Sequence, residues 1–118
     1  MLKQVSFSNE QRANPRFGLD VPIRIHFRKG ELILGHTVDI SESGVSVMVS
    51  LEMAIGQQIE LDFKLPSGPV NVYAVVKNKR AFRYGLEFVL TDKERTIIKH
   101  GCVDLSFGQT GSEDAPIS

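Results

Sequence analysis

Strict alternation of apolar and polar residues recurs along the middle of the chain, over residues 21–90. A period of two residues places apolar side chains on one face of a β-strand and polar side chains on the other. Turn-forming residues, such as Lys29-Gly30 and the stretch 66–69, separate six alternating stretches. The pattern therefore predicts an all-β, antiparallel barrel or sandwich, and it argues against alternating strands and helices.

A closed barrel is favoured over an open sandwich, because closure pairs every strand edge. After residue 90 the period changes. Thr91 and Glu94 form a capping-box pattern, and apolar positions at helical spacing follow, so we expect one helix over residues 92–105. In the second alternating stretch, the residues predicted to face the core are Leu32, Leu34, Val38 and Ile40.

The length of 118 residues fits one domain. We expect a flexible leader at residues 1–19, a barrel with its helix at residues 20–107 and a disordered tail at residues 108–118. Residues 1–10 have no apolar stretch of the kind found in a secretory signal, so we expect none, and no apolar run in the sequence is long enough to cross a membrane. The single cysteine, Cys102, excludes an internal disulfide. We therefore expect a cytoplasmic protein without membrane insertion.

Charge is balanced overall but unevenly distributed. Fourteen basic residues match fourteen acidic ones, so no global field favours DNA as a partner. The first 30 residues, however, carry six basic and two acidic residues, and residues 31–62 carry six acidic residues and no Lys or Arg. Basic patches of this size suit a small dianionic ligand. A second basic cluster comprises Lys77, Lys79, Arg80 and Arg83.

The residue patterns of common catalytic and metal sites are missing from the sequence. There is no Cys/His cluster at zinc spacing, no glycine-rich phosphate loop and no Gly-x-Ser-x-Gly elbow. We therefore predict neither an enzyme nor a bound metal or cofactor.

Two arginines four residues apart, Arg12 and Arg16, lie in the expected leader. In an extended chain their Cα atoms are about 13 Å apart, at about 3.3 Å per residue. A guanidinium group pairs bidentately with phosphate, stacks on purines and matches the O6 and N7 acceptors of guanine. Arg24 and Arg28 have the same spacing on a predicted strand, so the spacing alone does not identify a site.

The stretch 39–44 has the pattern Asp-x-Ser-x-x-Gly. Asp39 and Ser41 share one face at the end of the second predicted strand. The carboxylate can accept hydrogen bonds from N1 and N2 of guanine, and Ser41 can donate or accept. Gly44 permits a positive φ or a close approach of backbone to ligand. Taken alone, the stretch is more typical of a turn that closes a hairpin.

The order of these motifs resembles the PilZ family. An Arg-x-x-x-Arg leader precedes a strand, a turn, a second strand and the Asp-x-Ser-x-x-Gly stretch, and the return strand 83–88 has the sequence Arg-Tyr-Gly-Leu-Glu-Phe. The resemblance covers about residues 10–105. It implies a six-stranded antiparallel barrel with a C-terminal helix, and a bacterial domain that binds the second messenger cyclic di-GMP.

The resemblance also implies roles for individual residues. Arg12 and Arg16 are expected to hold phosphates and guanine, while the acidic turn forms the wall that contacts the guanine edge. Gln11 stands where some members carry another basic residue, so one ligand or an intercalated pair remains open. The ligand-binding residues implied are Arg12, Arg16, Asp39, Ser41 and Gly44, with Lys77 as a further contact.

We therefore expect a cyclic di-GMP receptor that orders its N-terminal arm on binding and then signals to a partner protein. One alternative is a PilZ-like adaptor that works by protein contact alone. A less favoured alternative is a small oligonucleotide-binding barrel, which needs exposed aromatic residues for base stacking. Tyr73 is the main candidate for an exposed aromatic residue, because the other aromatic residues considered fall in the core phase: Phe63, Phe82, Tyr84 and Phe88.

Overall fold

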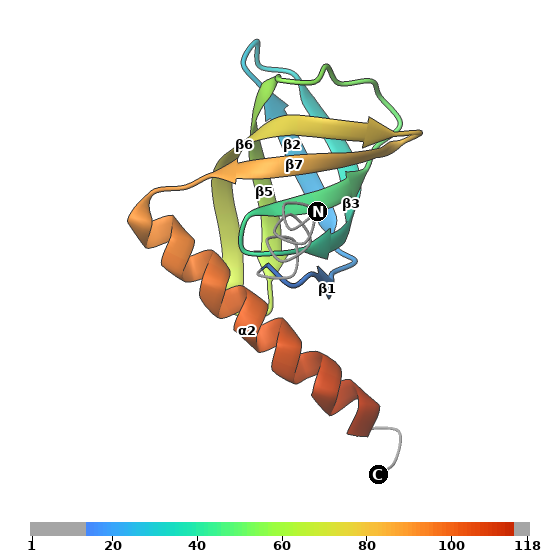
Figure 1. Ribbon diagram of the computed structural model, residues 1–118. Helices are drawn as coiled ribbons and strands as arrows, with labels where there is room; N and C mark the ends of the chain where they lie inside the picture. The colour runs from blue at the N-terminus through green and yellow to red at the C-terminus, as the bar shows by residue number, and fades with distance from the viewer. Residues whose placement is uncertain (1–13, 115–118) are drawn as a thin grey trace, which may run out of the picture.

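The computed structural model describes residues 14–114, with side chains as far as Phe107. This part of the chain forms seven strands and one helix (Figure 1). In chain order they are β1 (Phe17–Gly18), β2 (Pro22–Phe27), β3 (Leu32–Ile40), β4 (Gly44–Met48), β5 (Gln58–Leu65), β6 (Gly68–Arg80), β7 (Arg83–Val89) and α2 (Asp92–Asp114).

Six of these strands close into an antiparallel barrel, as predicted. The strand order is β3-β2-β5-β6-β7-β4, and β4 pairs back onto β3 to complete the ring. Strand β1 lies outside the ring and pairs with the end of β3, with Phe17 opposite Ile40. The last residues of the expected leader are therefore hydrogen-bonded to the barrel.

The barrel interior is filled by the apolar face of each strand. In β5 and β7, every second residue is buried, as the alternation in the sequence predicts. Each fully buried aliphatic side chain stabilises the fold by about 1.5–3 kcal/mol. The rings of Phe63 and Phe88 stack inside the barrel with their centroids 6.4 Å apart.

The predicted core face of β3 is wrong in its first half. Leu32 and Leu34 are 47% and 69% exposed, whereas Thr37 is buried. A β-bulge between Thr37 and Asp39 then shifts the register, so that Ile40 faces the core after all. A bulge inserts one extra residue and reverses which face the following side chains occupy.

A second correction concerns Phe82, which was expected in the core and is 61% exposed. It lies in the tight turn between β6 and β7, next to Ala81, whose φ of 57° is in the left-handed region. The turn interrupts the alternation that runs through β7. Tyr84, two residues later, is buried as predicted.

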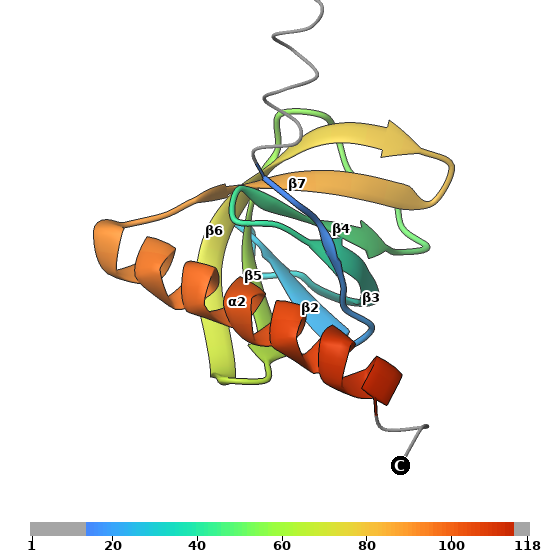
Figure 2. The ribbon, with the colours of Figure 1, turned by 60° about the horizontal axis from the view of Figure 1, so that its bottom comes forward.

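Helix α2 lies across one end of the barrel (Figure 2). Its N-terminus has the predicted capping box, in which the Glu94 amide donates to the Thr91 hydroxyl and the Thr91 amide donates to the Glu94 carboxylate. Ile98 and Cys102 are buried against the barrel, and burial raises the pKa of the Cys102 thiol to about 11. The helix continues to Asp114, beyond the predicted end at residue 105 and into the expected tail.

Candidate functional site

A row of small and polar residues crosses four neighbouring strands on the outside of the barrel. Asp39 of β3 pairs with Ser46 of β4, Ser46 pairs with Gly85 of β7, and Gly85 pairs with Asn78 of β6. We call these four residues the outer row. With about 4.8 Å between neighbouring strands, the row spans about 14 Å.

Two β-bulges place the ends of the outer row. The bulge in β3 turns Asp39 away from the core, and a register shift between Val76 and Asn78 acts in the same way on β6. Lys77 is the extra residue of the second bulge, since Asn78 rather than Lys77 pairs with Gly85. Asp39 and Asn78 therefore point outward, although the alternation before each bulge would place their side chains in the core.

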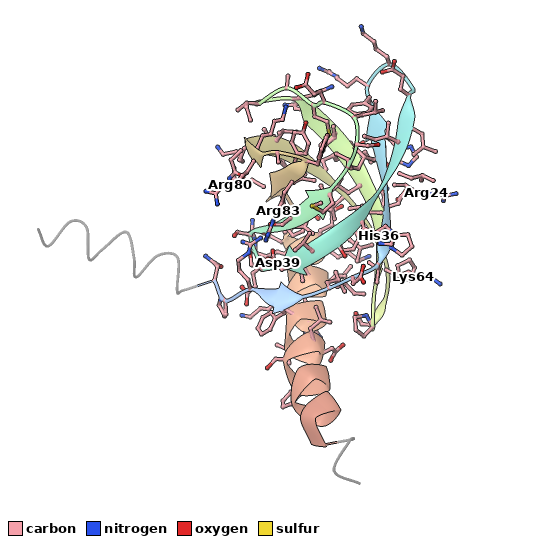
Figure 3. All side chains as sticks on the ribbon, turned by 90° about the vertical axis from the view of Figure 1, so that its right-hand side faces the viewer. Arg24, His36, Asp39, Lys64, Arg80 and Arg83 are labelled. Carbon is pink, nitrogen blue, oxygen red and sulfur yellow. The ribbon has the colours of Figure 1, made fainter. Side chains whose placement is uncertain are left out.

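Two arginines converge on Asp39 at one end of the row. Arg16 donates from Nε and Nη2 to Oδ1 of Asp39, at 2.9 Å and 2.7 Å, and Arg83 donates from Nη2 to Oδ2 at 3.0 Å. Arg16 Nη2 also donates to the Ser46 hydroxyl at 2.9 Å. Figure 3 shows Asp39 and Arg83 together on this side, with Arg24 on the opposite side of the barrel.

The arginine–carboxylate cluster is open to solvent. The side chains of Arg16 and Arg83 are 47% and 48% exposed, whereas that of Asp39 is 19% exposed. Exposed ion pairs contribute only about 0.2–1 kcal/mol to stability. An ionised carboxylate has about four acceptor positions, and the guanidinium groups occupy three of those on Asp39. One acceptor position and several guanidinium N–H donors therefore remain for a ligand.

The turn after β3 has a mainly architectural role. The Ser41 side chain is fully buried, and its hydroxyl accepts a hydrogen bond from the Ser43 amide at 3.2 Å. The Ser41 amide donates to the Gly44 carbonyl at 2.8 Å. A Cβ on Gly44 would overlap the carbonyl oxygen of Leu86, so only glycine lets β4 pack this closely on β7.

A shallow pocket of about 260 Å³ lies over this part of the barrel. Three of the residues predicted from sequence line it, namely Arg16, Gly44 and Lys77. Asp39 borders it through its contact with Arg16, whereas Ser41 is buried beneath the turn and Arg12 lies outside the described residues. The lining comprises Arg16, Ser43, Gly44, Val45, Ser46, Lys77, Asn78, Gly85, Leu86 and Glu87.

The two lysines of the basic cluster, Lys77 and Lys79, lie in different places. At the pocket, Nζ of Lys77 lies 3.5 Å from Oε1 of Glu87. Lys79 pairs with Glu52 at 2.6 Å, and its ammonium group lies 5.7 Å from the Tyr84 ring centroid. The hydrogen bond between Lys79 and Glu52 lowers the pKa of Glu52 and raises the pKa of Lys79. Lys79 is thus engaged away from the outer row.

Sequence reasoning missed four residues of this surface, namely Ser46, Asn78, Arg83 and Gly85, as site residues. Arg83 had a signal, because it belongs to the basic cluster and begins the return strand. The other three had none, since a residue joins the outer row only through the register of strands distant in sequence and through the two bulges.

Other kinds of site find no support in the described part of the chain. Residues 14–107, whose side chains are described, contain no group of three or more His, Cys, Asp or Glu placed to hold a metal ion. They also include no helix that combines the length and the apolar character needed to cross a membrane.

Comparisons with known proteins give one family. Residues 10–104 match the family model of the PilZ domain. Among solved structures, the PilZ domain of Escherichia coli YcgR with c-di-GMP superposes with a TM-score of 0.74 at 10% identity, covering 88% of this chain and 98% of that one. The PilZ domain of CeSA from a cellulose-synthesising bacterium gives a TM-score of 0.61 at 15% identity, with 81% and 98% covered.

Two longer proteins are also similar. The K. pneumonia MrkH–c-di-GMP complex has a TM-score of 0.71 at 20% identity, covering 84% of this chain and 54% of MrkH. Bacillus subtilis MotI/DgrA, an inhibitor of motility, has a TM-score of 0.66 at 18% identity, covering 80% and 51%. The chain thus spans about half the length of these two proteins. No curated protein sequence matches it.

Proposed function

The chain belongs to the PilZ domain family, and from this premise we propose that it is a receptor for cyclic di-GMP, which binds over the outer row. The observation that carries the proposal is the convergence of Arg16 and Arg83 on Asp39 beside a pocket. YcgR and MrkH, which share the fold, have been solved with cyclic di-GMP.

In this proposal the arginines supply the donors for the phosphates. The carboxylate of Asp39 holds both guanidinium groups over the barrel surface, which limits the entropy lost when they bind a ligand. Arg12 joins Arg16 from the preceding segment, and Lys77 adds a cation on the far side of the pocket. Charge-assisted bonds to phosphate are the strong ones, so these cations supply most of the affinity.

The uncharged motif residues have supporting roles in the same proposal. The remaining acceptor position of Asp39 takes one N–H of a guanine edge. Ser41 holds the turn from within, and Gly44 brings the backbone of β4 to the ligand at the pocket wall.

The regulatory step we propose is the ordering of the N-terminal arm. Pairing of Phe17 and Gly18 with β3 fixes the end of the arm and keeps Arg16 on Asp39. Phosphates bound by Arg12 and Arg16 then fold the preceding residues across the barrel, an order-on-binding change. The new surface formed by the arm is what a partner protein recognises.

A second candidate is an adaptor that works by protein contact alone. The observation in its favour is that Asp39 already has most of its acceptor positions filled by the chain's own arginines. Thermal unfolding separates the two functions, because a ligand at a hundred times its dissociation constant stabilises a receptor by about 2.7 kcal/mol. Cyclic di-GMP would not alter the unfolding of a pure adaptor.

The direct test is a calorimetric titration of the chain with cyclic di-GMP, with GTP and cyclic di-AMP as controls. Arg12→Ala and Arg16→Ala should each weaken binding about ten- to a hundredfold, since each charge-assisted bond contributes about 1.5–3 kcal/mol. Arg24→Ala is the matched control, because Arg24 lies on the opposite side of the barrel (Figure 3). Unchanged affinity in both arginine variants would exclude this mechanism.

A further inference from the structure

Asn78 faces outward only because of the bulge in β6. In a regular strand, the alternation that buries Ala74 and Val76 would point Asn78 into the core. With the bulge, Asn78 pairs with Gly85 and shares its outer face. The strand thus places an amide side chain at the end of the outer row, opposite Asp39.

The Asn78 carboxamide lies directly over the backbone of Gly85. A Cβ at position 85 would come within 2.5 Å of Oδ1 and 2.9 Å of Nδ2 of Asn78, so only glycine accommodates the amide there. Ser46, the next residue of the row, is small and nearly buried. The centre of the outer row is therefore formed by two small residues, Ser46 and Gly85. The row has an arginine–carboxylate cluster at one end and an amide at the other.

The amide groups of Asn78 and Asn71 differ in their hydrogen bonding. Both Glu60 and Asp62 accept hydrogen bonds from Asn71, on the other side of the barrel. Asn78 has no side-chain hydrogen bond to any residue of the described segment, although it lines the pocket together with Arg16. Its two N–H donors and its carbonyl acceptor are available to a ligand.

Cyclic di-GMP has two guanine bases, and Asp39, which lies at the other end of the outer row with a single acceptor position left, does not serve both of them. We propose that Asn78 binds a guanine base of the ligand through its carboxamide and is an affinity-determining residue of the site. On guanine, the O6 acceptor and the N1–H donor are adjacent, which complements the N–H and C=O of a carboxamide. The inference rests on the proposed function and deepens it.

This assignment separates the phosphate contacts of the ligand from a base contact. The phosphates lie with the cations Arg16 and Lys77 on two sides of the pocket, while one base lies in the pocket lined by Ser46 and Gly85 with its edge toward Asn78. Neutral hydrogen bonds do not depend on counterion release, whereas phosphate contacts weaken as salt rises. The salt dependence of binding therefore distinguishes a base contact from a phosphate contact.

The test is calorimetric titration of cyclic di-GMP into the unaltered chain and into Asn78→Ala, at several salt concentrations. Asn78→Ala should weaken binding about tenfold, which corresponds to about 1.4 kcal/mol, with the same salt dependence as the unaltered chain. Lys77→Met, from the same bulge, is the matched control and should reduce the salt dependence. Since Asn78 is exposed, its replacement should leave the thermal unfolding midpoint unchanged.

Each other outcome has a defined meaning. Tight binding by the unaltered chain together with unchanged affinity in Asn78→Ala would overturn the role of Asn78 and leave the proposed function standing. A loss of affinity accompanied by a reduced salt dependence would place Asn78 on a phosphate and overturn the base contact. If the unaltered chain does not bind cyclic di-GMP, the proposed function fails and this inference fails with it.

Discussion

At the scale of single residues, Asp39 organises the surface by holding two cations from segments far apart in the chain. Arg16 lies before the barrel and Arg83 begins β7, yet both donate to the same carboxylate. Without Asp39, two long and half-exposed side chains would sample many rotamers, and a ligand would have to order them at an entropic cost. We therefore expect Asp39 to contribute more to affinity than the single hydrogen bond that its free acceptor position can make with the ligand.

Asp39→Asn should weaken cyclic di-GMP binding about tenfold in the same titration. Removing the negative charge relieves a repulsion with phosphate of only about 0.5 kcal/mol at about 8 Å in water. It also frees Arg16 and Arg83, so that ligand binding must order both side chains at a cost of about 0.5–1.5 kcal/mol each. Asp62→Asn is the control, because Asp62 bonds to His26 and Asn71 away from the outer row. Equal or tighter binding by Asp39→Asn would refute the organising role.

The sequence allowed part of this surface to be predicted. Arg16 and Asp39 were predicted as ligand residues through a family resemblance, and the structure brings their side chains together. Asn78 could not be predicted, because the register shift that turns it outward has no residue signature in β6. The prediction for Arg12 remains outside the described residues.

At the scale of secondary-structure elements, α2 closes the barrel at a point where a side chain would not fit. Gly101 lies against Leu65 at the end of β5, and a Cβ there would overlap the Leu65 side chain. Glycine costs a helix about 1 kcal/mol relative to alanine, which sequence reasoning alone counts as a weakness. The contact gives the physical reason for it, since close packing of helix on barrel compensates for the lower helix propensity.

Gly101→Ala should therefore destabilise the protein by about 1 kcal/mol despite the better helix propensity. Forcing an extra methyl group into a packed core costs about 1–3 kcal/mol, and the middle of this range exceeds the gain of about 1 kcal/mol in the helix by about 1 kcal/mol. Urea denaturation monitored by circular dichroism measures the change. Lys99→Ala, at an exposed position two residues earlier, should change stability by less than about 0.5 kcal/mol. A Gly101→Ala protein more stable than the original would contradict the packing account.

Elements with unbroken alternation were predictable from sequence, and elements with bulges were not. The burial pattern of β5 follows its sequence residue by residue. In β3, the bulge after Thr37 reverses the phase, so a single alternation could not fit both halves of the strand. The end of α2 was missed for another reason, since its last residues have low helix propensity and continue a helix already begun.

At the scale of the whole molecule, the barrel is a rigid support and the outer row is one of its faces. Six strands contribute to a closed ring, so no strand can move alone without breaking ladder hydrogen bonds on both sides. Helix α2 covers one end of this ring (Figure 2). In our proposal, the barrel therefore keeps its shape when the ligand binds, and the N-terminal arm carries the change.

The measurement that most directly tests this account is an NMR titration of the ¹⁵N-labelled chain with cyclic di-GMP. The account predicts saturable shifts at the backbone amides of Ser46, Asn78 and Gly85, because these residues line the proposed binding surface. The amides of Glu60 and Asn71, on the other side of the barrel, should remain unchanged. Shifts confined to that other side, or none at saturating ligand, would contradict the claim that the outer row binds the nucleotide.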